Sequence, residues 1–543
     1  MRRQALIGMW AWLCLAAPAA GSGLERAMEA ELSRAKNELK AEGYPSPYYV
    51  SLTAIDLETW ELKCSLGGRL GALRARQRFV TPDLRVGDYS LDNHPTGPSS
   101  GFVARQLPFD DDELGLRHEL WRLLDGAYKS AVAEFLRKQA LRVARGKAEY
   151  DTDDLSRESV KVWRAEPPAM PWDYARLESL CQDAARAFGR KPALQTEASF
   201  RARHQWSRFR DTEGRKVDFP RSSLEISLDM VDMAADGMRL FANRRLVFRT
   251  PEAMPSGEDL QRLVGDMSRD LELLRLAKTT SPFSAPALID PSVAAAVVLG
   301  VALRLSGEEQ RNPGGSQVFR GKLGRLVLPE ELSLIDDPTR SRFQGVELAG
   351  HYDWDDQGLP PRPATLIERG VLQGLLLSRY PVLGFPRSNG HGRSMAGYWP
   401  EGLPGNLFLR SEKPAPVSSL LERLRQECRR RGKPYGLWVR QLRHFTQQQG
   451  TEGHGSIRLV PGQVYLVEAQ TGRTILVRDL DLVGTPLDLM DSILTAGDDP
   501  AVQNLVLGAP MSVISPSLLL DDAELQRSEM RPERPPILSA PAR

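Results

Sequence analysis

Histidines and carboxylates gather in the second half of this 543-residue chain, as a metal or acid/base site would require. Four of the seven histidines, His351, His391, His444 and His454, lie within one stretch of about a hundred residues. Glycines flank His391 and His454, in NGHGR and EGHGS, and Asp355, Asp356 and Glu368 are near in sequence. Imidazole and carboxylate groups bind metals and move protons in many hydrolases. One hypothesis is therefore a metal or acid/base site here. The alternative is that these histidines and glycines shape loops.

Other catalytic motifs are not matched. Ser388 lies near His391, but no G-x-S-x-G turn supports a serine nucleophile. His118-Glu119 begins an H-E-x-x-H pattern, yet Arg122 stands where the second histidine is needed. There is also no G-x-x-x-x-G-K-[ST] loop and no dinucleotide fingerprint. Serine hydrolase, H-E-x-x-H protease and nucleotide-dependent chemistry are therefore not expected.

The elements around the histidine-rich stretch predict a hairpin that could form one wall of a cleft. Residues Ala364–Ser378 contain two short apolar strands joined at Arg369-Gly370. The acidic turn Asp355-Asp356 precedes them, and the loop SNGHGR, ending at Arg393, follows. Arg379 and Arg393 could contact a peptide carboxylate or backbone carbonyl groups, or they could be ordinary surface arginines.

Periodicity elsewhere predicts a mixed chain. Helices are expected at residues 24–42, 174–188 and 260–274, with a long one beginning after the acidic cluster 110–113. That cluster could bind a cation, but acids at a helix start are explained by the helix dipole. Strands are expected at residues 50–66, with hairpin turns at Glu213-Gly214, Asp236-Gly237 and Thr471-Gly472. The fold class is α+β, in two lobes with mainly antiparallel sheets.

Charge and the N-terminus suggest an exported protein without nucleic-acid partners. The chain has 72 basic and 70 acidic residues, interleaved, for a net charge of +2. Arg2-Arg3, an apolar run to Ala17 and then Pro18-Ala19 predict a secretory signal cleaved near residue 20. No later segment offers the roughly 18 apolar residues of a transmembrane helix. We expect a periplasmic or secreted location.

Three cysteines would remain after cleavage: Cys64, Cys181 and Cys428. They are widely spaced and show no C-x-x-C pattern, so buried single thiols are expected, with one distant disulfide as the alternative.

Several segments together resemble the TldD/PmbA family, bacterial peptidases linked to microcin maturation and once called modulators of DNA gyrase. The residues that carry the resemblance are RVGDYSLDN (85–93), LIDPSVAAA (288–296), QVFRGKLG (317–324) followed by DDPT (336–339), DDQGLPPRPATLIERGVLQGLLLSR (355–379), SNGHGR (388–393), DLDLVGTPLDLMDSILTAGDD (479–499) and PSLLLDDAEL (516–525). The resemblance covers most of the mature chain and implies the family's two-lobed fold, with a cleft that accommodates peptides.

The resemblance also implies where a metal would be bound. Active members carry a helical His-Glu-x-x-x-His and a late Cys, which supply three ligands and the base of a metallopeptidase. Here those positions fall on Gly300, Val301, Leu305 and Val502. The run VVLGVALRL (297–305) contains no His, Cys, Asp or Glu. We therefore expect no catalytic residues at these positions, no bound cofactor, and a slot filled by apolar core.

These observations predict an exported, non-catalytic TldD/PmbA-like protein that binds peptide or unfolded segments or serves as a partner subunit, as a homodimer or heterodimer. The alternatives are an active metallopeptidase with relocated zinc ligands and a structural envelope component. The expected divisions are a signal peptide (1–20), an N-terminal part (21–255), a metallopeptidase-type domain (256–527) and a Pro-rich tail (528–543). The candidate cleft residues are Asp356, Glu368, Arg379, His391, Arg393 and His454.

Overall fold

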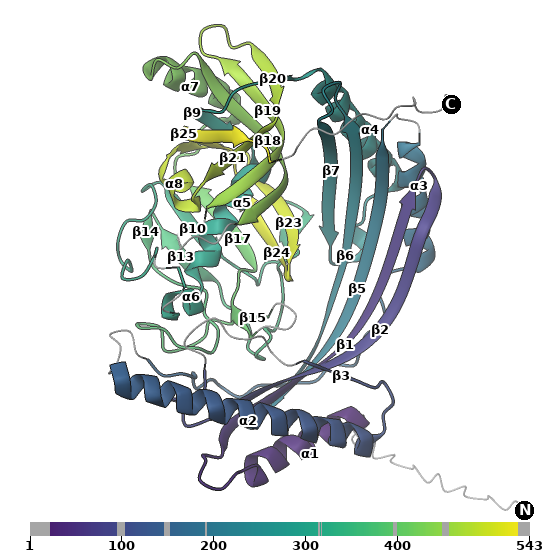
Figure 1. Ribbon diagram of the computed structural model, residues 1–543, viewed down its shortest axis with the longest axis vertical. Helices are drawn as coiled ribbons and strands as arrows, with labels where there is room; N and C mark the ends of the chain where they lie inside the picture. Colours follow the sequence, from purple (N-terminus) through teal and green to yellow (C-terminus); the bar gives the residue numbers. More distant parts are fainter. Residues whose placement is uncertain are drawn as a thin grey trace, which may run out of the picture.

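The computed structural model describes residues 22–94, 104–145, 152–189, 193–312, 315–316, 318–394, 399–447 and 456–529. The first half of the chain builds a long curved sheet that bends around the second half (Figure 1). Its seven strands run in the order β3-β2-β1-β5-β6-β4, with β7 also paired to β6. They are β1 (Pro47–Ser65), β2 (Gly68–Val86), β3 (Arg105–Leu107), β4 (Val162–Trp163), β5 (Gln195–Asp211), β6 (Lys216–Met233) and β7 (Arg239–Phe248).

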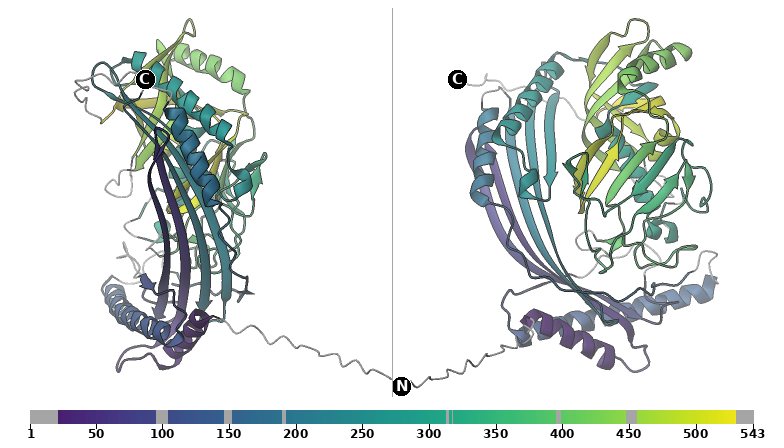
Figure 2. Two further views of the ribbon diagram at one scale, coloured as in Figure 1. Left: turned by 90° about the vertical axis from the view of Figure 1, so that its right-hand side faces the viewer. Right: turned by 180° about the vertical axis from the view of Figure 1, so that it is seen from behind.

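Four helices cover the convex face of this sheet, away from the second half (Figures 1 and 2). They are α1 (Gly23–Glu38), α2 (Glu113–Arg145), α3 (Tyr174–Phe188) and α4 (Gly257–Leu276). Side chains alternate along each strand, so β1 sends Val50, Leu52 and Ala54 to the core under α1 and α2. Further along, Leu62 and Cys64 join the core under α3 and α4. The alternate residues of β1 are left for the concave face.

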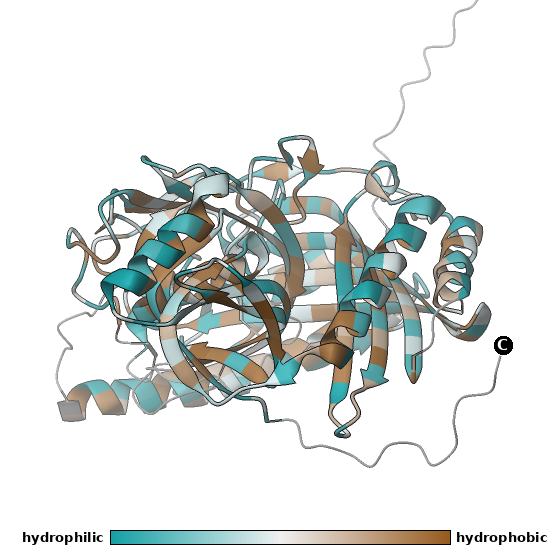
Figure 3. Ribbon diagram, turned by 90° about the horizontal axis from the view of Figure 1, so that it is seen from above, coloured by the Kyte–Doolittle hydropathy of each residue, from teal (hydrophilic) through white to brown (hydrophobic). Residues whose placement is uncertain are grey.

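The second half holds two sheets with helix α5 (Pro291–Ala302) packed against strands of both. One sheet has the order β14-β13-β10-β17-β24-β23. Its strands are β14 (Val371–Leu372), β13 (Ala364–Glu368), β10 (Leu332–Asp336), β17 (Asn406–Ser411), β24 (Ala509–Ser515) and β23 (Ala501–Leu507). Val293 to Ala302 of α5 are all buried, which places this helix inside the core of the second half. Figure 3 shows hydrophobic residues along the strands of both halves.

The other sheet has eight strands, and five of them close into a ring because β18 pairs with both β9 and β19. Its strands are β8 (Lys278–Thr279), β9 (Phe283–Ile289), β18 (Tyr435–Gln447), β19 (Ile457–Glu468), β20 (Thr474–Arg478), β21 (Leu480–Gly484), β22 (Ile493–Ala496) and β25 (Leu518–Arg527). Smaller elements complete this half: η2 (Leu303–Leu305), α6 (Gly307–Arg311), α7 (Val417–Arg430), α8 (Pro486–Asp491), β11 (Arg342–Phe343), β12 (Val346–Glu347), β15 (Gly392–Arg393) and β16 (Glu401–Gly402). In the first half, the short helix η1 (Pro251–Ala253) lies between β7 and α4.

The predicted fold class is confirmed, since the structure is α+β with mainly antiparallel strands in two lobes. The acidic cluster before α2 caps helices, as expected. Asp112 accepts a hydrogen bond from the backbone N–H of Gly115 at 3.1 Å. Asp111 accepts from the backbone N–H groups of Gly23 and Leu24 at the start of α1. These carboxylates satisfy helix N–H groups that have no partner within the helix.

Two expectations are wrong. The segment QVFRGKLG (317–324) resembles a strand of the family, but residues 318–324 form turns, because Gly321 and Gly324 adopt φ values of 68° and 75°, which a strand excludes. The next strand along the chain is β10, at Leu332–Asp336. Cys64 and Cys181, expected as single thiols, are joined in a disulfide between β1 and α3, with their Cα atoms 5.9 Å apart. The pairing could not be read from a separation of 117 residues. Cys428 is free and buried.

The predicted signal and most of the Pro-rich tail lie outside the described residues. Among the helices that the structure describes, none is both long and apolar enough to cross a membrane.

Candidate functional site

A cavity of about 370 Å³ lies between the concave face of the long sheet and the second half of the chain. Strands β1, β2, β5 and β6 supply its floor, with Thr53, Ile55 and Leu57 among the residues from β1. The opposite wall comes from loops of the second half and from the turn between β23 and β24. Its size falls in the range of small-molecule and peptide side-chain sites, about 300–1,000 Å³. We call this cavity the cleft.

Asp356 and Arg379, two of the candidate residues, line the cleft. Asp356 accepts a hydrogen bond from the backbone N–H of Ser394 at 2.7 Å and forms an ion pair with Arg221 of β6. Arg221 also donates to the carbonyl of Trp354 at 2.8 Å. Asp356 thus ties the acidic turn of the second half to the floor of the cleft.

Arg379 is almost fully buried, with 1% of the residue exposed. Its guanidinium donates to the carbonyl of Ser156 at 2.6 Å and lies 3.0 Å from the carboxylate of Glu213 in the β5–β6 turn. It also lies over the ring of Tyr49, 4.9 Å from the ring centre. Burial alone would lower the pKa of Arg379, but Tyr49 and Glu213 together raise it, so the side chain stays charged. Arg379 therefore links the two halves of the chain, and its charge is already paired with a carboxylate of the protein.

His391 and Arg393 lie behind the cleft wall and do not line the cleft. His391 is fully buried, with Nδ1 2.8 Å from Asn389 Oδ1 and Nε2 3.8 Å from Asp336 Oδ1. Arg393 donates to the carbonyls of Pro404 and Pro510 at 2.7 and 2.8 Å. Both side chains fix loops, which agrees with the loop-shaping alternative for this stretch.

The remaining candidates do not join this site. Glu368 is exposed at the end of β13, beside the Arg369-Gly370 turn. His454 lies outside the described residues. Within the described ranges, no group of three or more His, Cys, Asp or Glu side chains is arranged to hold a metal ion.

The four positions that would carry the metal site are packed against apolar neighbours. Helix α5 contacts β23, so Gly300 and Val301 are brought near the strand that carries Val502. Val301 and Leu305 are fully buried in the main cluster of the second half, and Val502 packs against Leu348, Phe408 and Ile514.

Gly300 has no room for a side chain. A Cβ atom there would lie 2.8 Å from Cγ of Pro486, at the start of α8. None of the four side chains offers a lone pair, and zinc requires three such ligands. The residues present therefore do not fit a zinc ion.

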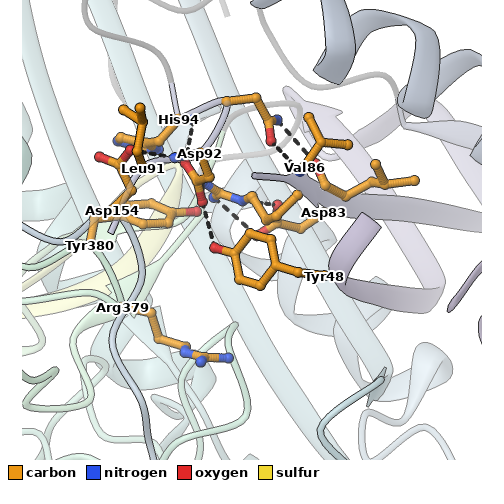
Figure 4. A network of polar contacts seen from close by, with 12 residues as sticks. Tyr48, Asp83, Val86, Leu91, Asp92, His94, Asp154, Arg379 and Tyr380 are labelled. Carbon is orange, nitrogen blue, oxygen red and sulfur yellow. Dashed lines mark hydrogen bonds and ion pairs between the residues drawn. The ribbon is translucent and has the colours of Figure 1, made fainter. Parts of the chain in front are cut away.

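A buried polar network, missed from the sequence, lies at the base of the cleft (Figure 4). Its centre is Asp92, which is fully buried. The Asp92 carboxylate lies 3.3 Å from Arg85 and accepts a hydrogen bond from the hydroxyl of Tyr48 at 2.8 Å. Arg85 also contacts Asp83, a residue of the cleft. We call these residues, with Asp154, Lys138 and Arg311, the buried hub.

Asp154 connects the buried hub to the second half of the chain. It accepts a hydrogen bond from the backbone N–H of Asp92 at 2.7 Å and pairs with Lys138 of α2 and Arg311 of α6. His94 packs beside it against Tyr380, with ring centres 4.1 Å apart. Burial lowers the pKa of His94 well below its usual value, and Arg85 and Arg311 lower it further, so this histidine is neutral.

Known proteins match both the sequence and this fold. The PmbA/TldA metallopeptidase C-terminal domain matches residues 282–527. A metalloprotease of Methanothermobacter thermautotrophicus is 26% identical over 429 residues, which cover 77% of this chain and 86% of that protein. Residues 282–527 therefore belong to the TldD/PmbA family.

Solved structures share this fold along nearly the whole chain. TldE from Thermococcus kodakarensis superposes with a TM-score of 0.59 at 12% identity, covering 92% of this chain and all of that one. A protein described as a modulator of DNA gyrase from Thermotoga maritima gives a TM-score of 0.63 at 16% identity, covering 92% and 99%. At these identities the likeness concerns the fold alone.

The TldD/PmbA motif RVGDYSLDN has a structural role in this chain. It supplies Arg85 and Asp92 to the buried hub, and Asn93 accepts from the backbone N–H of Val86 at 2.8 Å. The contacts of this motif therefore hold the end of β2 at the base of the cleft.

Glu401 of β16 provides a pH-dependent contribution to stability near this wall. Although the Glu401 side chain is exposed, loss of hydration beside this wall and the nearby carboxylates of Glu308 and Glu309 together raise its pKa to about 7. The folded chain therefore keeps a proton that the unfolded chain releases, and stability falls as pH rises from about 4.5 to about 7. We expect Glu401→Gln to raise the melting temperature at about pH 8 and to change it little at about pH 4. Calorimetry at both pH values, with the exposed Glu412→Gln as control, checks this. Equal effects at the two pH values would contradict it.

Proposed function

We propose that this protein is an exported, non-catalytic member of the TldD/PmbA family that binds extended peptide segments in the cleft. The observation that carries the proposal is the contrast between the two parts of the family's site. The metal positions Gly300, Val301, Leu305 and Val502 lack donors and pack as core. The cleft, by contrast, is open and has a polar and apolar lining drawn from both halves.

The edge of a sheet supports peptide binding at the cleft. Among the described strands, β23 makes backbone pairs only with β24, but near its middle the Asn504 side chain donates to the carbonyl of Val247 in β7. The part of its other edge at Val506, which lines the cleft, is therefore where a peptide could pair. All seven of its residues are half-buried, and Val506 lines the cleft. An extended peptide can add to such an edge through main-chain hydrogen bonds, while neighbouring pockets take its side chains.

The proposal is tested by metal content and cleavage. We expect mass spectrometry of the purified protein to find well under one zinc per chain, because the residues that would bind zinc lack donor atoms. Cleavage of an unfolded casein substrate should be absent, with and without a chelator. The metalloprotease of Methanothermobacter thermautotrophicus, assayed in parallel, controls for the substrate. Stoichiometric zinc with chelator-sensitive cleavage would establish the active-peptidase alternative instead.

Peptide binding needs a direct measurement of its own. Binding of fluorescent unfolded peptides by anisotropy is expected in the micromolar range, typical of unoptimised peptide recognition. Capture of one stoichiometric protein partner with no peptide bound would favour the structural role.

Export is part of the proposal and is supported by the disulfide. Disulfides persist in oxidising compartments such as the periplasm and the exterior, and are rare in the cytosol. Cys64 and Cys181 are paired, whereas Cys428 is free. We expect the mature chain, isolated without reductant and denatured, to show a single reactive thiol, and its mass to show cleavage after Ala19. Three thiols, or an intact N-terminus, would contradict export.

A partner subunit is the remaining part of the proposal. We propose that the chain acts as a homodimer or with a related subunit, as its resemblance to the family implies. Native mass spectrometry of the protein purified from its own cells distinguishes the two forms, and a monomer would contradict both.

A further inference from the structure

The concave face of the long sheet has three zones that differ in what covers them. Near the base, Tyr49 and Ser51 of β1 are buried and form one end of the cleft lining. Towards the top, the same face carries ion pairs that reach solvent, such as Glu61–Arg201 at 2.5 Å and Lys63–Glu197 at 3.2 Å. The zone between them lines the cleft.

The middle zone carries three apolar side chains that face the open space of the cleft. Ile55 and Leu57 of β1 and Phe79 of β2 line the cleft side by side, since Ile55 pairs directly with Phe79. All three are half-buried. We call these three residues the apolar patch. Apolar surface left at a cleft floor is stabilised when an apolar group covers it, by about 25 cal/mol for each Å² removed from water.

The charged residues around the apolar patch already have partners. Asp83 pairs with Arg85, Asp356 with Arg221, Arg203 with Glu225 at 3.2 Å, and Arg379 with Glu213. A charged side chain entering the cleft would lose hydration without meeting an unpaired charge of opposite sign. An uncharged polar side chain would also lose hydration for little gain in binding free energy. An apolar side chain would gain binding free energy by covering the apolar patch.

A ligand bound in the cleft must also form hydrogen bonds with the backbone groups at the end of β23. Val506, Gly508 and Ala509, at the end of β23 and its turn into β24, form the wall that faces the sheet. An extended chain seated there could pair with this edge and direct alternate side chains toward the floor. A free lipid or small apolar molecule would cover the patch but leave the edge without a partner.

We propose that the cleft selects extended peptide segments carrying a large apolar side chain, such as Leu or Phe, which packs on Ile55, Leu57 and Phe79. This inference rests on the proposed peptide-binding function and adds the class of side chain that is recognised. It also assigns recognition to the sheet of the first half, not to the positions of the lost metal site.

The experiment uses fluorescent nonapeptides of Gly and Ser that differ only at the central residue, which is Leu, Phe, Ser, Asp or Lys. Anisotropy titration of the full mature protein should show the Leu and Phe peptides bound about tenfold or more tightly than the Ser peptide, with Asp and Lys weakest. The variants Leu57→Ser and Leu57→Ser/Phe79→Ser should lose this preference. Leu70→Ser is the matched control, because Leu70 of β2 is 63% exposed and lies outside the cleft. Its preference should equal that of the wild type.

The outcomes distinguish selection of apolar side chains from peptide binding itself. If no peptide binds the wild type, the proposed peptide-binding function fails. If all five peptides bind equally, peptide binding stands and apolar selection is overturned. Selection by the apolar patch is also overturned if the Leu57→Ser variant, shown to be folded by circular dichroism, keeps the wild-type preference.

Discussion

Replacing Arg379 with Met is expected to destabilise the protein by about 3–5 kcal/mol, the range observed when one partner of a buried ion pair is removed. Arg379 is 1% exposed and contacts Glu213, Asp211 and the carbonyl of Ser156. Met fills much of the same volume but cannot donate a hydrogen bond. Glu213 would keep only the Tyr89 hydroxyl and a longer contact with Arg215.

The loss should appear in thermal and denaturant unfolding of the purified variant. Arg262→Met on α4 is the matched control, because the Arg262 side chain is 71% exposed and pairs only with Asp259 across one helical turn. Surface pairs of this kind contribute about 0.2–1 kcal/mol, so the control should unfold almost as the wild type does. If both variants lost the same stability, the buried contacts of Arg379 would not join the two halves.

Local elements could be predicted from the sequence because their signals are local. Helix α3 begins and ends where expected, since Asp173 caps its first N–H groups and Gly189 follows its last residue. The hairpin turns are marked by Gly214, Gly237 and Gly472, which all adopt positive φ values. The motif at Ala364–Ser378 identified both the family and its hairpin, although β14 has only two residues.

The site was harder to predict because sequence spacing does not say which way a side chain faces. Asp356 and Arg379 line the cleft, while His391 and Arg393, from the same stretch, are buried behind it. The floor of the cleft comes from β1, β2, β5 and β6, between about 130 and 300 positions earlier, and no motif marks it. Alternation along β1 contained a signal, because it separates Ile55 and Leu57 from the core residues Leu52 and Ala54.

The buried hub depends on contacts between residues that are distant in sequence. It joins Tyr48, Asp92, Lys138, Asp154 and Arg311, and only Arg85 and Asp92 lie within a recognisable motif. Charged residues are rarely buried unless they are paired, so a composition or periodicity argument assigns them to the surface. Their burial here follows from the meeting of five separate segments at the base of the cleft.

Replacing Asp154 with Ala should have an effect of similar size to that of Arg379→Met, about 3–5 kcal/mol. Asp154 is 2% exposed and partners the ammonium of Lys138, which is itself buried. Without the carboxylate, Lys138 would keep the carbonyl of His94 and the charge of Asp92, to which it makes no direct hydrogen bond. Burial lowers the pKa of Lys138 even with Asp154 present, so the unpaired ammonium would be still less favourable.

A second substitution tests whether the stability lost in Asp154→Ala is due to the unpaired charge of Lys138. In the double variant Asp154→Ala/Lys138→Met the uncompensated ammonium is gone, so it should be more stable than Asp154→Ala alone. Asp153→Ala, at the exposed neighbouring position, should unfold as the wild type does. Additive losses in the double variant would mean that Asp154 acts through packing alone. Because Asp154 also holds Arg311 of the second half, a recovered double variant that still binds peptide weakly would show that this ion pair positions the two walls of the cleft.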